Sequence, residues 1–190
     1  SGELGEIEEA EAEFSLELPV DQGLIQRNPE LGGGAMRDLG CYPLHWLQSV
    51  DPTSIAHLEV EVAKAASGVD ETVSGQLRFA SSVVGRFRTS IAPGQPLVRS
   101  LRVAGSRGVL DFANPLAPHD GSCIVLNGKE VATFDLGSGA TFAHQLKAVC
   151  EAITDGTPLP TEGEAILRQQ RAIDLVCSKF DGPACGEPAA

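Results

Sequence analysis

The sequence predicts an α+β domain: one open, mostly antiparallel sheet with helices packed on one face. Three observations predict this fold class. An almost perfectly alternating segment opens the chain, strand-like segments separated by turn residues fill its middle, and two amphipathic segments with helical spacing close it. At 190 residues the chain is long enough for one well-buried domain and short for two. We therefore treat residues 1–190 as a single domain.

The opening segment, residues 6–18, has the two-residue period of a strand that is buried on one side. Its Glu and Ala content would also fit a helix, but Leu and Phe at every second position favour the strand. The apolar face carries Ala10, Ala12, Phe14, Leu16 and Leu18, and the opposite face carries Glu9, Glu11, Glu13 and Glu17.

The middle of the chain, residues 55–135, reads as strands joined by short turns, which predicts mainly antiparallel pairing. The last two strands form a hairpin that turns at Asn127 and Gly128, a dipeptide typical of tight hairpin turns. The predicted strands are Ala56–Ala66, Glu71–Phe79, Val83–Ile91, Val98–Ala104, Val109–Phe112, Ser122–Leu126 and Glu130–Phe134.

Two helices are predicted near the end of the chain. The first has Gly156 at the position of a C-terminal cap. The second is expected to begin at a capping box, Thr161 to Glu164. Their apolar stripes are Phe142, Leu146, Val149, Cys150 and Ile153 for the first, and Ile166, Ile173, Cys177 and Phe180 for the second.

The richest stretch is RNPELGGGAMRDLGCYPLHW, residues 27–46, which is a turn, three glycines and a helix. At 100° per residue this helix has an apolar side, which docks it on a core, and an opposite side with a carboxylate, a phenol and an imidazole. Pro43 should kink it, because proline cannot donate to the Leu39 carbonyl. A polar face that simply meets water is the alternative. The apolar side is Met36, Leu39, Trp46, Leu47 and Val50; the other side is Asp38, Cys41, Tyr42 and His45.

Composition argues against several classes of protein. The net charge of −12 argues against nucleic acid and anionic membranes as partners. No apolar run approaches about 20 residues and no basic-then-apolar leader is present, so we expect a cytoplasmic location. Five scattered cysteines without a CxxC pair indicate reduced thiols and no metal site. P-loop, GxSxG and HExxH motifs are absent, and the segment DLGSGATF has Phe142 where a dinucleotide loop requires its third glycine.

The stretch 27–46 resembles the characteristic motif of the glucose–fructose oxidoreductase/inositol dehydrogenase (Gfo/Idh/MocA-like) family. The resemblance covers nearly the whole chain, because further family motifs follow in the expected order. These are GELGEI at residues 2–7, LRVAGS at 101–106 with Gly108, and FAHQL at 142–146 followed by Gly156, Pro158, Ile173 and Asp174.

The resemblance implies the C-terminal domain of a two-domain oxidoreductase that uses NAD or NADP on a sugar, polyol or related hydroxy or carbonyl compound. The N-terminal Rossmann domain, with its glycine-rich loop and a lysine, is absent from this sequence, so we expect the chain alone to be inactive. Asp38 matches the family's active-site aspartate. Tyr42 matches a position that is His in inositol dehydrogenase-like members and Tyr in dihydrodiol dehydrogenase-like and glucose–fructose oxidoreductase-like members.

The resemblance therefore makes Tyr42 the expected acid/base and Asp38 the residue that orients substrate hydroxyls. A phenol with a pKa of about 10 is a poor base at neutral pH unless a nearby ammonium lowers that value. Arg27 and His45 are candidate substrate-binding residues, although His45 could be only a neighbour. Gly33 and Gly34 are candidate cofactor-binding residues at a helix N-terminus. The alternative, that the turn needs them for positive φ and close packing, stays open.

The face of the sheet opposite the helices should be strongly charged. A row of glutamates on the first strand repels itself unless cations stand on neighbouring strands, so we expect Arg86, Arg88 and Arg102 on the same face. One reading is a solvated face; the other is a homodimer through this open face. A non-catalytic interaction or regulatory module that keeps the fold is the alternative function.

Overall fold

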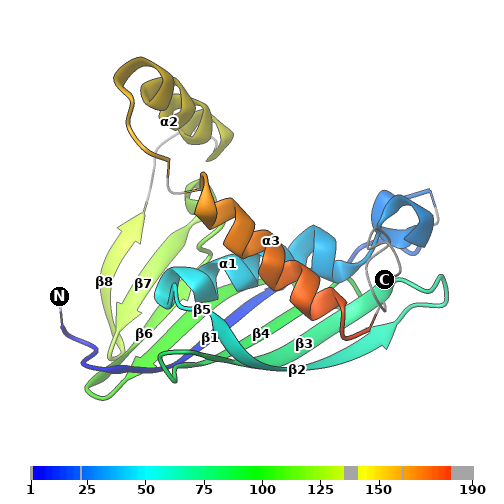
Figure 1. Ribbon diagram of the computed structural model, residues 1–190, viewed down its shortest axis with the longest axis horizontal. Coiled ribbons are helices and arrows are strands. Elements are labelled where there is room, and N and C mark those ends of the chain that lie inside the picture. Colours follow the sequence, from blue (N-terminus) through cyan, green and yellow to red (C-terminus); the bar gives the residue numbers. More distant parts are fainter. Residues whose placement is uncertain (1, 22, 135–140, 160, 181–190) are drawn as a thin grey trace, which may run out of the picture.

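Eight strands make one sheet in the part of the chain that the structure, a computed structural model, describes: residues 2–21, 23–134, 141–159 and 161–180 (Figure 1). The strand order is β2-β3-β4-β1-β5-β6-β7-β8. The strands are β1 Ile7–Ser15, β2 Ile55–Lys64, β3 Asp70–Phe79, β4 Val84–Ser90, β5 Val98–Gly105, β6 Gly108–Ala113, β7 Ser122–Leu126 and β8 Lys129–Phe134. Every predicted strand is confirmed, with ends that shift by three residues or fewer.

The opening strand lies inside the sheet. β1 pairs parallel to β4 and antiparallel to β5, whereas the other neighbouring pairs are antiparallel. A parallel pair needs a crossover connection, which the central helix and two further strands supply between β1 and β4. The predicted α+β class with a mostly antiparallel sheet is therefore confirmed.

Helices α1 (Cys41–Val50) and α3 (Glu164–Cys177) lie on one face of the sheet (Figure 1). A π-helical turn, Met36–Gly40, leads directly into α1, and two short 3₁₀ turns, Ile25–Arg27 and Pro29–Leu31, precede it. The predicted apolar side of the central helix is confirmed. Met36 and Leu47 are fully buried against the inner face of the sheet, together with Phe14 of β1.

Helix α2 (Thr141–Asp155) departs from the prediction. It projects away from the sheet (Figure 1), and none of its residues is buried. Phe142 and Ile153, which lie on its apolar stripe, are 80% and 79% exposed. The expectation that all helices pack on the sheet is therefore wrong for α2. Its predicted end is confirmed, because Gly156 has a φ of 70° and its N–H donates to the Ala152 carbonyl.

The predicted capping box of the last helix is wrong. Helix α3 begins at Glu164, and its N-cap is Gly163, with no hydrogen bond from a side chain. Thr161 therefore lies outside the first turn. A side chain that caps this helix would have to stand at the N-cap position, 163, which is a glycine two residues after Thr161.

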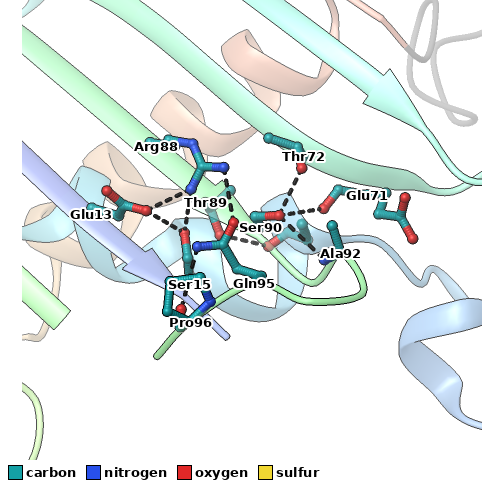
Figure 2. Close-up of polar contacts among 11 residues, drawn as sticks. Glu13, Ser15, Glu71, Thr72, Arg88, Thr89, Ser90, Ala92, Gln95 and Pro96 are labelled. Carbon is teal, nitrogen blue, oxygen red and sulfur yellow. Dashed lines mark hydrogen bonds and ion pairs between the residues drawn. The ribbon is translucent and has the colours of Figure 1, made fainter. Parts of the chain in front are cut away.

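The open face of the sheet carries the predicted charges. Glu11 lies opposite Arg86 on β4 and opposite Arg102 on β5, and Glu13 lies opposite Arg88. Arg88 donates to Glu13 at 2.6 Å and also contacts Ser15 and Gln95 (Figure 2). The glutamates and arginines thus share one face, as predicted, and their pairs form within one chain.

Two features are absent from the described residues. No helix among them is long and apolar enough to cross a membrane. Within the same ranges, no three His, Cys, Asp or Glu side chains gather as a group that could hold a metal ion. The segment DLGSGATF lies mostly outside these ranges, since residues 135–140 are not described.

Candidate active-site helix

The glycine turn before the central helix is closed by its own backbone. The Gly33 N–H donates to the Asn28 carbonyl at 2.9 Å, and the Gly34 N–H donates to the Gln26 carbonyl at 3.0 Å. A side chain on Gly33 would lie 2.7 Å from the Asn28 oxygen, a distance that real Cβ atoms do not show. Both N–H groups are therefore occupied, and close packing excludes any larger residue at Gly33.

The helix that follows begins against a carboxylate of the same chain. Asp70, on β3 and only 3% exposed, accepts the Met36 N–H at 2.7 Å through Oδ2. Gly34 has a φ of +125°, and a Cβ there would overlap this carboxylate. Asp70 thus stands where an anionic ligand would meet this helix start, which argues against cofactor binding at Gly33 and Gly34. The packing alternative is the one that the structure supports.

Arg27 also has a structural role. It is only 3% exposed, and its guanidinium pairs with Glu71 at 2.6 Å. It also donates to three backbone carbonyls: Leu18 and Ile91, each at 2.6 Å, and Pro19 at 3.2 Å. These contacts tie the strand ends to the glycine turn. Its donors are engaged and its side chain is covered, which favours a structural role for Arg27 over substrate binding.

Proline shapes the helix through its missing N–H. Pro43 is buried in α1, and the turn before it, Met36–Gly40, is π-helical. The π turn thus directly precedes the proline, whose missing N–H cannot pair with the Leu39 carbonyl. Such turns often occur at functional sites.

Tyr42 of α1 is 37% exposed. Its ring meets the Phe14 ring edge-on, with centroids 5.4 Å apart, and lies 6.5 Å from the Trp46 ring. Burial raises the pKa of the Tyr42 phenol above its usual value, and the nearby Cys41 and Asp38 raise it further. The phenol is therefore protonated at neutral pH in this chain.

Asp38 and His45 flank Tyr42 along the helix, and both are half-buried. Asp38 Oδ1 accepts from the Gln26 side chain at 3.2 Å, so the turn before the helix orients the carboxylate. Burial lowers the pKa of His45, and the positive charge of Arg168 on α3 lowers it further. His45 is thus neutral near pH 7. Asp38 therefore lies close enough to Tyr42 to act on its phenol, whereas Arg27 pairs with Glu71.

Helix α3 holds the active-site helix in a way that the sequence did not indicate. The Gln169 side chain donates to the Cys41 carbonyl at 2.7 Å, one residue before Tyr42. His45 and Gln169 line the same small cavity of about 160 Å³ between the two helices. Gln26 and Gln169 therefore position the candidate site. No spacing signal could reveal Gln169, because it lies 128 residues from Cys41.

Known proteins match the sequence of this chain. A family model described as "GFO/IDH/MocA C-terminal domain" matches residues 1–111. The chain is 26% identical to D-xylose 1-dehydrogenase (NADP(+)) 2 of Haloferax volcanii, over 98% of the chain and 58% of that protein. It is 30% identical to human trans-1,2-dihydrobenzene-1,2-diol dehydrogenase, over 82% of the chain and 47% of that protein.

Solved structures share the fold. An aldose-aldose oxidoreductase from Caulobacter crescentus superposes with a TM-score of 0.79 at 20% identity, over 92% of this chain and 53% of that one. A 3-ketoreductase from Actinomadura kijaniata gives 0.73 at 22% identity, over 93% and 55%. The chain thus spans about half the length of the relatives that it matches.

Proposed function

The chain belongs to the GFO/IDH/MocA family as a C-terminal domain, and from this premise we propose that it is the substrate-binding part of an oxidoreductase. The substrate would be a sugar, polyol or related hydroxy or carbonyl compound, and Tyr42 would exchange its proton. The names of the relatives support this class, since they include an NADP-dependent xylose dehydrogenase and a diol dehydrogenase. The observation that carries the proposal is the exposed Tyr42 with Asp38 one turn before it on the same helix.

The proposed chemistry needs a group that gives or takes a hydroxyl proton at the reacting carbon. Tyr42 is suited to donate, because its raised pKa keeps the phenol protonated. Asp38, held by Gln26, is suited to accept hydrogen bonds from neighbouring substrate hydroxyls and so to fix their orientation. His45 is neutral and adds a polar neighbour without a fixed charge.

The glycine turn does not fit the pyrophosphate of a nucleotide cofactor. The N–H groups of Gly33 and Gly34 are occupied, and the Asp70 carboxylate at the helix start would repel a pyrophosphate. We propose that NAD or NADP is bound mainly by a further domain of the protein, outside this chain.

The test is Tyr42→Phe in the protein that includes the nucleotide-binding domain. Turnover should fall by about 100-fold or more, the usual scale of general acid–base help, while the affinity for the cofactor stays nearly unchanged. His45→Gln is the matched control on the same helix face and should lower turnover far less. Unaltered turnover in Tyr42→Phe, with chemistry rate-limiting, would remove Tyr42 from the mechanism.

We also propose that the chain forms a homodimer through the open face of the sheet. This face has a hollow of about 410 Å³ that Arg86, Arg88 and Arg102 line together with Glu11, Glu13 and Asp111. Because these charges are already paired within one chain, two copies could meet without burying an isolated ion. Light scattering at low and high salt tests this, with Arg86→Glu as the probe and Arg37→Glu, on the helix side, as the control. A monomer at tens of micromolar would refute the proposal, and a dimer that ignores the Arg86 reversal would refute the role of these charges.

A further inference from the structure

A second cavity, of about 410 Å³, lies where the end of α1 and the residues after it meet α3. It is on the inner side of the sheet but does not include Tyr42 or Asp38. Gln48 of α1, Pro52 to Ile55 of the following segment, and Arg168, Arg171 and Leu175 of α3 line it. Figure 1 shows α3 beside α1, with the start of β2 at their edge. The size is in the range of small-molecule sites in proteins.

The cavity wall is apolar over most of its area and carries two cations. Pro52, Ile55, Ala172 and Leu175 supply the apolar part. Arg168 and Arg171 supply the charge, and the only acidic residue in the lining is Glu164. Glu164 contacts Arg171 at 3.4 Å, with both side chains about two-thirds exposed, so this pair is weak. The lining therefore keeps an excess of positive charge, in a protein whose net charge is −12.

Arg168 shows an unmet hydrogen-bonding need. Its Nε atom is buried and has no hydrogen-bond partner among the described residues, so a ligand in the cavity would meet the terminal nitrogens of the guanidinium. The Gln48 side chain, which is close enough to interact, donates to the Arg168 carbonyl at 3.4 Å and offers nothing to the guanidinium there. Buried donors without a partner are rare in folded proteins. A guanidinium presents a planar fork of donors that matches a carboxylate.

We propose that this cavity binds a small organic carboxylate with an apolar body. The carboxylate would accept hydrogen bonds from Arg168 and Arg171, and the apolar body would lie on Ile55, Ala172 and Leu175. A carboxylate fits better than a bare inorganic anion, because most of the wall is hydrocarbon and would leave a fully hydrated ion without partners. The inference does not rest on the proposed oxidoreductase function, because its residues are distinct from Tyr42 and Asp38.

Benzoate is the probe and benzamide, its neutral isostere, is the matched ligand control. Titrated into the isotopically labelled 190-residue chain, benzoate should give saturable NMR shifts at the backbone amides of α3 and residues 53–55. Benzamide should bind about tenfold more weakly or worse, because it lacks the charge-assisted hydrogen bonds. Binding that is equal for the two ligands would show an unspecific apolar crevice and overturn the proposal.

Variants of the two cavity arginines test which positive charge binds the carboxylate. Arg168→Gln should weaken benzoate binding by about tenfold or more and leave benzamide binding nearly unchanged. Arg171→Gln, at a more exposed position, gives a second reading if Arg168→Gln unfolds. Arg78→Gln removes one positive charge on the other side of the sheet and is the matched control, with no expected effect. Absence of saturable benzoate binding, or unchanged affinity in both cavity variants, would overturn the inference.

Discussion

Gly34→Ala should destabilise the chain much more than an ordinary surface substitution. Gly34 has a φ of +125°, which strains any residue with a Cβ, and strain of this kind costs about 1–3 kcal/mol. A Cβ at this position would also lie 2.7 Å from the Asp70 carboxylate carbon, so the carboxylate must move. Its hydrogen bond to the Met36 N–H would then be lost, at a cost of about 1 kcal/mol for a helix cap. The expected total is about 2–4 kcal/mol in the free energy of unfolding.

Urea unfolding followed by the fluorescence of Trp46, the only tryptophan, measures this loss. Gly32→Ala is the matched control, because Gly32 has a φ of +73° but no atom within 4 Å of an added Cβ. It should cost about 1–2 kcal/mol, the strain of a left-handed residue alone. Asp70→Ala completes a double-mutant cycle. With the carboxylate removed, Gly34→Ala should cost no more than its strain. Additive losses in the double mutant, or equal losses for Gly34→Ala and Gly32→Ala, would refute the clash with Asp70.

Two further predictions concern arginines. Arg27→Met should lower the free energy of unfolding by about 3 kcal/mol or more, because it leaves Glu71 and three backbone carbonyls without their shared donor. Urea unfolding measures this loss. Arg78→Gln is the control, and it should change the free energy of unfolding by less than about 0.5 kcal/mol. Arg168→Gln should raise the pKa of His45, because a cation that disfavours imidazolium is removed, while burial still holds that pKa below about 6.5. NMR titration of the four histidines checks this, and an unshifted or lowered His45 value contradicts it.

The strands could be predicted from the sequence because their signals are local. Alternation along β1 and the Asn127–Gly128 turn between β7 and β8 each involve residues that are near one another in the chain. The shared face of Glu11, Arg86 and Arg102 also followed, since like charges in a row need opposite charges beside them. The parallel pairing of β1 with β4 could not be predicted, because it depends on where a distant strand inserts into the sheet.

The contacts of the glycine turn and of Arg27 could not be predicted for a related reason. Their roles depend on Asp70 and Glu71, which lie about 40 residues further along the chain and come to this turn only through the sheet. The sequence pattern of a glycine before a helix is the same whether a ligand or a neighbouring carboxylate occupies the helix start. For α2, likewise, helical periodicity identifies an apolar stripe, including Phe142 and Ile153, but carries no information on what covers it.

The proposed proton exchange at Tyr42 depends both on this chain and on a charged group outside it. Burial, Cys41 and Asp38 all raise the pKa of the phenol, so the chain by itself prepares a proton donor. Accepting a proton near neutral pH would need a cation close enough to reverse these three effects. Arg168 lowers the pKa of His45 but does not shift the pKa of Tyr42. A lysine from a nucleotide-binding domain would supply the missing charge, and docking of that domain would then switch Tyr42 from a donor alone to a group that works in both directions.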